Sequence, residues 1–166
     1  VSVDVGAKVH GWNSDTAKTY AVGHISHNKK KLMEVTEEAL YKALSVVKDG
    51  VKVGDISHEI CSYVYKNNMS IPEEFSGHGI GRSLHEEPYV YNIGQKGQGP
   101  TLKTGDTIAI EPIVIFGKKE IKIAEDKWTA ISADQTPAAH YEHTVEITKK
   151  GYKILTSLDQ KEVING

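Results

Sequence analysis

Residues 76–88 read SGHGIGRSLHEEP, which places two histidines, His78 and His85, seven positions apart in a glycine-rich segment. Glycines at positions 77, 79 and 81 remove side-chain bulk around His78 and permit positive φ, so the backbone can fold tightly around a bound group. A structural histidine in a glycine-rich turn has the same local pattern, and the glycine spacing misses the dinucleotide-binding motif. The segment therefore indicates a ligand or catalytic histidine once other residues supply partners.

The strongest such partner is Glu111. It interrupts TIAIEPIVIF, residues 107–116, which we predict as a strand buried on both faces. A buried carboxylate is costly unless it is paired with a cation or takes up a proton. A salt bridge to a basic residue is the alternative, but the neighbouring sequence offers no obvious partner. The pattern favours a metal-binding or catalytic role for Glu111.

Three further carboxylates are predicted on or beside strands. Asp4 lies within the predicted strand 1–8, on the face opposite its valines, and Asp15 lies in the turn that follows. Glu142 enters the predicted strand 141–148. By itself, Asp15 would be an ordinary turn residue and Glu142 an ordinary strand-end residue.

Together with His78 and Glu111 they make a set of four carboxylates and one imidazole. Oxygen-rich sets with one nitrogen suit manganese, iron, cobalt or zinc, and four carboxylates neutralise two dications. Such a two-metal site can activate water near neutral pH and stabilise an oxyanion.

The rest of the chain predicts an α+β fold, with helices on one face of a mostly antiparallel sheet, in a single domain of residues 1–166. Expected elements are a strand at 16–23, a helix at 28–48 with Gly50 as its C-cap signal, a helix at 55–67 with Asp55 as its N-cap, a loop at 92–100, short strands within 121–139 and a final strand at 152–155.

Composition excludes several classes of protein. A net charge of −2 over 166 residues gives no general attraction to nucleic acid. A single cysteine excludes an internal disulfide framework and suits a reducing compartment; Cys61 is expected to be a small buried hydrophobe. No apolar run is long enough for a membrane span.

The motifs resemble those of the type I methionine aminopeptidases, pita-bread metallopeptidases of family M24. The matching segments are VDV (3–5), SDT (14–16), GHGIG (77–81), HEEP (85–88), IEP (110–112) and YEHT (141–144). The resemblance runs from Val1 to about Leu155 and implies the pita-bread fold.

The resemblance also implies roles for residues. Asp4 would chelate one metal ion, Asp15 and Glu142 would bridge both ions, and His78 with Glu111 would complete the other. Glu111 would be the general base, and His85 would contact the scissile peptide. Trp128 falls where the family has a tryptophan near the methionine pocket, with a packed core aromatic as the alternative.

Two departures concern the pocket. Asn13 and Ser14 stand where the family often has His-Gly, and Leu84 stands where a pocket aromatic is common. Family members also begin earlier, with a segment that carries a third histidine and part of the pocket wall. We therefore expect this chain to be the later part of the full domain; if it truly begins at Val1, the metal ligands are all present but substrate recognition is incomplete.

The activity implied is removal of N-terminal methionine from nascent polypeptides in the cytoplasm, by a monomer with two divalent ions of cobalt, manganese, iron or zinc. Its partners would be nascent N-termini, with the ribosome as a place of encounter.

Prolidase and aminopeptidase P relatives share the ligands, but the short segment between His85 and Glu111 favours the methionine enzymes. A non-catalytic pita-bread binding protein is the alternative from another class. A serine or cysteine hydrolase is disfavoured, because the sequence contains no Gly-x-Ser-x-Gly elbow.

Overall fold

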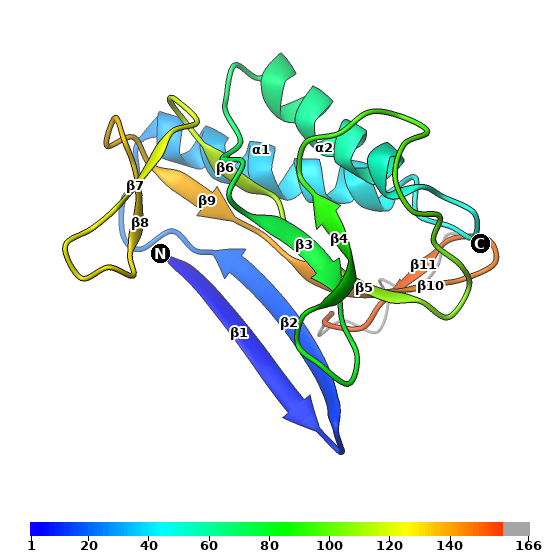
Figure 1. Ribbon diagram of the computed structural model, residues 1–166. Coiled ribbons are helices and arrows are strands. Elements are labelled where there is room, and N and C mark those ends of the chain that lie inside the picture. The colour runs from blue at the N-terminus through cyan, green and yellow to red at the C-terminus, as the bar shows by residue number, and fades with distance from the viewer. Residues whose placement is uncertain (158–166) are drawn as a thin grey trace.

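Two helices lie on one side of a five-stranded sheet, and a long β-hairpin lies on the other side (Figure 1). This computed structural model describes residues 1–157, so residues 158–166 of the predicted domain lie outside it. The elements are β1 (Ser2–Val9), β2 (Trp12–Thr19), α1 (His27–Leu44), α2 (Val53–Lys66), β3 (Ser76–Gly79), β4 (Glu86–Tyr91), β5 (Thr107–Ile110), β6 (Ile113–Ile115), β7 (Ile121–Ile123), β8 (Ala130–Ser132), β9 (Ala138–His140), β10 (His143–Ile147) and β11 (Tyr152–Ile154).

The main sheet has the strand order β11-β10-β5-β3-β4, and its neighbours pair antiparallel. Three two-stranded sheets, β1-β2, β6-β9 and β7-β8, complete the architecture among the described residues. The predicted α+β class, the predicted pairing of β10 with β11 and the short strands within 121–139 are confirmed.

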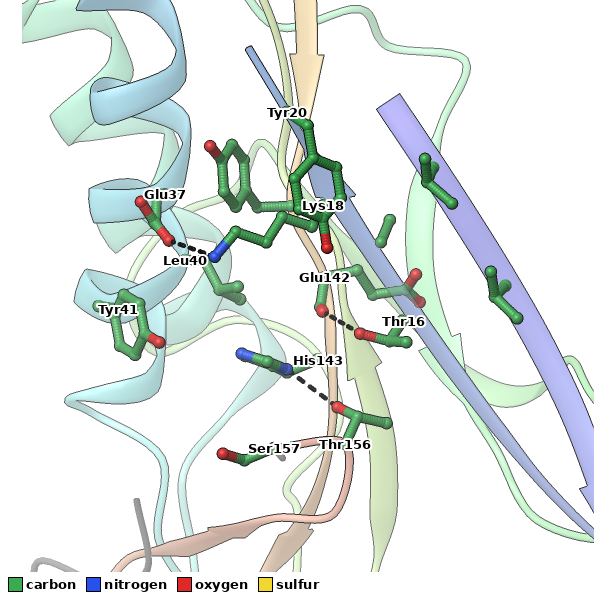
Figure 2. Close-up of a pocket in the computed structure, with 14 residues that line it drawn as sticks. Thr16, Lys18, Tyr20, Glu37, Leu40, Tyr41, Glu142, His143, Thr156 and Ser157 are labelled. Atoms are coloured by element: carbon green, nitrogen blue, oxygen red, sulfur yellow. Dashed lines mark hydrogen bonds and ion pairs between the residues drawn. The ribbon is translucent and has the colours of Figure 1, made fainter. Parts of the chain in front are cut away.

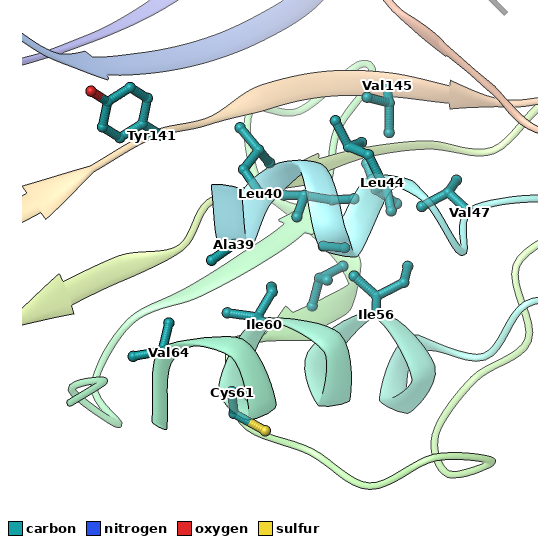
Figure 3. Packing of buried hydrophobic residues seen from close by; sticks show 14 of the residues in the cluster. Ala39, Leu40, Leu44, Val47, Ile56, Ile60, Cys61, Val64, Tyr141 and Val145 are labelled. Atoms are coloured by element: carbon teal, nitrogen blue, oxygen red, sulfur yellow. The ribbon is translucent and has the colours of Figure 1, made fainter. Parts of the chain in front are cut away.

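The core lies between the helices and the sheet. Leu40 and Leu44 of α1 meet Ile56 and Ile60 of α2, and Val145 of β10 lies over them (Figure 3). These side chains are at most 1% exposed, which follows from the helical spacing of apolar residues in both helices. The described part of the chain contains no helix that is both long and apolar enough to span a membrane.

Both helices differ from the prediction at one end. The helix α1 ends at Leu44 rather than Lys48, because Val46 and Val47 donate to carbonyls three residues back, as in a tightened final turn. Gly50 is not its cap but lies beyond it, with φ +82° and its N–H bonded to the Leu102 carbonyl. In α2, Asp55 is not the N-cap; its carboxylate accepts from the Lys52 N–H at the helix start.

The first part of the glycine-rich segment, Ser76–Gly79, is strand β3 rather than a loop, and its glycines serve another purpose. Gly77, Gly79 and Gly81 are absent from the residues with positive φ. A Cβ on Gly77 would lie 2.3 Å from the Ala109 carbonyl oxygen, and one on Gly79 would lie 2.3 Å from the Glu87 carbonyl oxygen. Glycine is therefore required for the close approach of β3 to β5 and β4.

The strand predicted over residues 107–116 is broken into β5 and β6 at Glu111 and Pro112. Proline has no N–H to donate to a ladder, so pairing with the sheet stops there. The two halves pair with different strands, β5 with β3 and β10, and β6 with β9. Glu111 consequently lies at a corner between two sheets, where its side chain is 14% exposed.

The hairpin turn is shorter than predicted. His10 and Gly11 form it with φ of 50° and 81°, the two positive values that suit a tight hairpin turn. The prediction that Asp15 lies in the turn is wrong: it lies within β2, opposite Gly6. This register decides where the hairpin carries its carboxylates.

Candidate metal centre

The hairpin presents Asp4 and Asp15 on one face. Asp4 pairs with Ala17, and Asp15 is two residues from Ala17, so the side chains of all three point the same way. The hairpin is joined to the body at Glu142, whose N–H donates to the Ala17 carbonyl at 2.8 Å. The Thr16 hydroxyl in turn donates to the Glu142 carbonyl at 2.9 Å.

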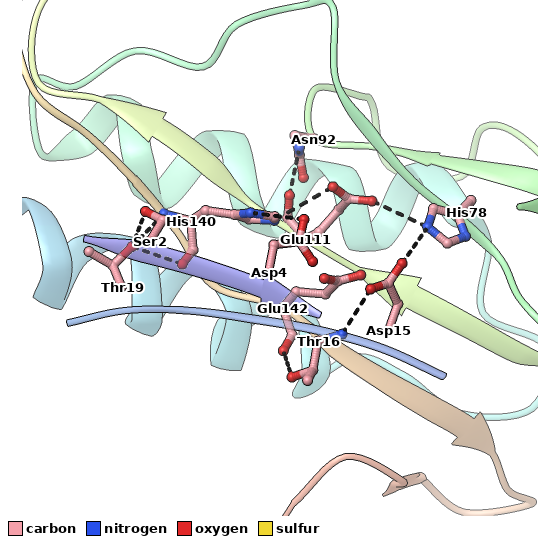
Figure 4. Close-up of polar contacts among 10 residues, drawn as sticks. All are labelled: Ser2, Asp4, Asp15, Thr16, Thr19, His78, Asn92, Glu111, His140 and Glu142. Atoms are coloured by element: carbon pink, nitrogen blue, oxygen red, sulfur yellow. Dashed lines mark hydrogen bonds and ion pairs between the residues drawn. The ribbon is translucent and has the colours of Figure 1, made fainter. Parts of the chain in front are cut away.

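His78 faces this hairpin from β3 and is 3% exposed. Its Nδ1 lies 2.9 Å from the Gly79 carbonyl oxygen, which can only accept, so Nδ1 carries the proton. Nε2 is left as the ligand atom. It lies 3.6 Å from Glu111 Oε1 and 3.9 Å from Asp15 Oδ2 (Figure 4).

Glu142 is the most deeply buried carboxylate of the group, at 2% exposure, and its Oε1 has no hydrogen-bond partner within residues 1–157. Burial, followed by repulsion from Glu111, Asp15 and Asp4, raises the pKa of Glu142 to about 9. Burial and the Asp4 charge also raise the pKa of Asp15. Carboxylates that raise one another's pKa in a buried site lack a counter-charge, and bound cations would supply it.

Three groups of side chains have potential ligand atoms within 4.8 Å of one another: Asp4, Asp15 and Glu142; His78, Glu111 and Glu142; Asp15, His78 and His85. The five predicted metal ligands are thus brought together from β1, β2, β3, the β5–β6 corner and the start of β10. The first two groups share Glu142, an arrangement that fits two neighbouring ions. Their oxygen-rich composition with one imidazole suits borderline divalent metals.

The predicted substrate residues are distributed differently. His85 is exposed, and its ring packs edge-on against His78 with the centroids 4.5 Å apart. Leu84 is half-buried beside Gly6, where a Cβ would lie 3.5 Å from Leu84 Cδ1. Asn13 is bonded to the glycine segment, because its Nδ2 donates to the Gly81 carbonyl at 2.9 Å.

Trp128 stands apart from them. It lies in the turn between β7 and β8 and is 88% exposed, so the packed-core alternative is wrong. In Figure 1 the β7–β8 hairpin lies beside the N-terminus, at the edge of the molecule. Its role at a methionine pocket stays a prediction.

Two residues near Glu111 were missed by the sequence reasoning. His140 Nε2 lies 3.6 Å from Glu111 Oε2, and Asn92 Nδ2 donates to the Glu111 carbonyl at 3.1 Å. His140 is two positions before Glu142, a spacing that places strand residues on one face, and this signal was available. Nothing local marks Asn92, which follows β4 in a loop.

The opposite face of the hairpin borders a cavity of about 380 Å³ between β1, β2 and α1. Val3, Val5 and Leu40 line it, and an ion pair of 3.5 Å joins Lys18 to Glu37 across it (Figure 2). Val3 and Val5 are about half exposed, at 47% and 52%. The hairpin therefore has one face with the carboxylates and an opposite face on which Val3 and Val5 lie beside Lys18.

Residues 1–149 match the metallopeptidase family M24. The chain is 46% identical over 156 residues to methionine aminopeptidase 1 of Bacillus subtilis and 45% identical to the Mycoplasma capricolum methionine aminopeptidase, covering 94% and 96% of this chain. It spans 63% and 64% of those relatives' lengths, about two thirds at most.

Solved structures agree with the fold. The methionine aminopeptidase from Thermotoga maritima superposes with a TM-score of 0.92 at 44% identity, over 94% of this chain and 63% of that one. The enzyme from Rickettsia prowazekii gives a TM-score of 0.91 at 38% identity, with the same coverage. Prolidase from Pyrococcus furiosus, at 24% identity and a TM-score of 0.76, shares the fold. The predicted pita-bread fold is confirmed.

Proposed function

The chain belongs to metallopeptidase family M24, and from this we propose that it carries the metal centre of a methionine aminopeptidase, which removes N-terminal methionine from nascent polypeptides. The single observation that carries the proposal is that two groups of three residues, which share Glu142, each bring their potential ligand atoms within 4.8 Å of one another: Asp4, Asp15 and Glu142, and His78, Glu111 and Glu142. The identities of 45–46% to named methionine aminopeptidases support the choice of substrate.

Membership of the family implies divalent metal ions, and the residues fit them because the buried Glu142 Oε1 lacks a partner within the described chain. We propose two ions of manganese, iron, cobalt or zinc. Asp4, Asp15 and Glu142 would hold one, and His78, Glu111 and Glu142 the other. By the family resemblance, Asp15 would contribute to both. When bound, the ions supply a water nucleophile near neutral pH and stabilise developing negative charge.

The chain's own residues would then handle the proton and the substrate. Glu111, at the corner between β5 and β6, takes the proton of the attacking water and returns it to the leaving amine. His85, which is exposed and packs against His78, would contact the scissile peptide. Leu84 and Trp128 are proposed to line the methionine pocket, for which a small second residue in the substrate is expected.

The broader setting is part of the same proposal. Residues 1–166 would form the later part of one catalytic domain, acting as a monomer in the cytoplasm on nascent chains, with the ribosome as a place of encounter. A prolidase-like activity is the second candidate; the lower identity to prolidase, 24% against 38–46%, disfavours it.

The test is release of free methionine from Met-Ala-Ser under anaerobic, reducing conditions, with and without added Mn²⁺. Release is expected to require the metal and to disappear in Glu111→Ala, and Ala-Pro should not be cleaved. Glu38→Ala is the matched control, because Glu38 is exposed on α1. Cleavage of Ala-Pro without methionine release would favour the prolidase reading. A folded chain that binds metal without cleaving either peptide would contradict the proposed activity of this chain.

A further inference from the structure

His140, the last residue of β9, faces the Glu111 carboxylate from the side opposite His78. His78 Nε2 lies 3.6 Å from Glu111 Oε1, and His140 Nε2 lies 3.6 Å from Glu111 Oε2. Figure 4 shows Glu111 between the two imidazoles. The two oxygens of the Glu111 carboxylate thus face two different imidazoles.

The backbone of His140 is held firmly. Its N–H donates to Thr19 Oγ1 at 2.9 Å, and Thr19 Oγ1 donates to the His140 carbonyl at 3.0 Å. Ser2 Oγ lies 2.8 Å from the same hydroxyl and can donate to it. Across β9, His140 is also paired with Ile113 of β6. The hairpin and β6 therefore determine together where the imidazole lies.

The His140 imidazole has a buried nitrogen without a hydrogen-bond partner among residues 1–157. The side chain is 12% exposed, and this nitrogen is Nε2. The 3.6 Å separation from Glu111 Oε2 is too long for a hydrogen bond, although contacts of this kind often tighten when a site is loaded. Nδ1 lies 4.0 Å from Asp4 Oδ2, so carboxylates face both ring nitrogens.

The placement suits a supporting residue better than a metal ligand. Within the described part of the chain, none of the three groups of ligand atoms that converge within 4.8 Å includes His140. Residues that hydrogen-bond a metal-binding carboxylate fix its orientation, and their loss typically lowers metal affinity about 10–100-fold. His140 is within reach of one oxygen of Glu111 while the other faces His78.

We propose that His140 is a positioning residue: it donates from Nε2 to Glu111 Oε2 and so orients Glu111 to bind metal through Oε1, an inference that rests on the proposed metal-dependent function. Removing this donor would weaken the ion held by His78, Glu111 and Glu142. The other ion, held by Asp4, Asp15 and Glu142, would be affected much less.

The experiment is anaerobic calorimetric titration of the 166-residue chain with Mn²⁺, comparing wild type, His140→Phe and His140→Gln. The phenylalanine keeps a flat ring without a donor, and the glutamine keeps an N–H donor. We expect His140→Phe to bind one ion with an affinity about 10-fold or more below wild type and the other ion with an affinity close to wild type. His140→Gln should recover most of the lost affinity. His58→Gln is the control, because His58 lies on α2 and bonds Ser62 rather than the site.

Unchanged affinities in a folded His140→Phe chain would overturn the inference, and so would a His140→Gln chain as weak as His140→Phe. If His140→Phe does not fold, Thr19→Val removes the hydroxyl that holds the His140 backbone and should weaken the same ion. Unchanged binding in that variant would equally overturn the inference. A wild-type chain that binds metal but releases no methionine contradicts the proposed function alone, because the titration needs no substrate.

Discussion

The body beneath α1 and α2 and the β1–β2 hairpin are stabilised in different ways. Side chains such as Ile60 and Val145 in the body are fully buried, whereas each residue of β1 is exposed. The hairpin is joined to the body mainly through polar contacts, at Glu142, His140 and Gly81. The body is held by apolar burial, whereas the site on the hairpin is built from hydrogen bonds and from carboxylates that repel one another.

From this difference we expect folding of the body and completion of the metal centre to be separable. The core needs no ion, because its apolar residues lie in contact with one another. The carboxylates of Asp4 and Asp15 reach Glu142 only when the hairpin lies against β10. Changes in the two regions should therefore have different consequences for stability and for metal binding.

The largest expected effect comes from filling the metal centre. Mn²⁺ at about 100 times its Kd should stabilise the chain against urea by about 2.7 kcal/mol for each ion bound, because only the folded chain binds it. In Glu142→Gln the increase in unfolding free energy on adding Mn²⁺ should fall to a small fraction of the wild-type increase, since both proposed groups lose their shared ligand. Urea unfolding with and without EDTA measures this. The exposed Glu38→Gln chain should keep the full gain, and an equal gain in Glu142→Gln would contradict the assignment.

The next effect compares one substitution in the two regions. Val145→Ala in β10 should cost about 2 kcal/mol, because the valine is 0% exposed and leaves a cavity. Val5→Ala in β1 should cost under about 1 kcal/mol, since Val5 is already 52% exposed. Both residues are in strands, so strand preference cancels in the comparison. Equal losses of unfolding free energy would show that the hairpin is packed as firmly as the body.

A smaller effect is expected where the body and the hairpin meet. The buried Tyr141 hydroxyl donates to the Thr19 carbonyl at 3.1 Å, so Tyr141→Phe should cost about 1 kcal/mol. Tyr20→Phe, at a tyrosine that is 52% exposed, is the matched control and should change little. Hydrogen exchange should speed up in β1 and β2 of Tyr141→Phe but not in α2. Faster exchange throughout the chain would argue against a separable hairpin.

The smallest effect belongs to a surface turn outside both regions. The Lys118 N–H, followed by the Thr136 hydroxyl and N–H, lowers the pKa of Asp134 to about 2 from 3.8. A lowered pKa means that this carboxylate stabilises the fold above pH 3.8 and that the contribution is lost as pH falls towards 2. Asp134→Asn should flatten the acid limb of a stability-against-pH curve. If the acid side of the curve is unchanged by Asp134→Asn, the Asp134 carboxylate is not the source of this pH dependence.

The sequence predicted the set of residues at the site better than it predicted their surroundings. The sequence identifies Glu111 because a carboxylate inside an apolar run is rare, and Asp4 because it lies on the strand face opposite the valines. His140 and Asn92 were missed, because their importance comes from a contact with Glu111 made across different strands. A single sequence does not reveal such a contact.

The errors in the fold have a common origin. The turn at His10 and Gly11, the end of α1 at Leu44 and the break after Ile110 are all boundaries of elements. Local pattern identifies the middle of an element, while its ends depend on individual φ angles and hydrogen bonds that the periodicity of the sequence does not encode. Trp128 shows the same limit, because nothing in its neighbourhood indicated an exposed turn.

The sequence by itself determined the residue types at the site, the α+β class and the apolar faces of the helices, because these depend on chemistry and on short-range periodicity. Tertiary structure alone decided that Asp4 and Asp15 share a face, that β3 needs glycine where it meets β5, and that His140 faces Glu111. Strand register and corner geometry arise from contacts between residues far apart in the chain, such as Asp15 and Thr144, which are 129 positions apart. A shift of the strand register by one residue would turn each carboxylate away from the site.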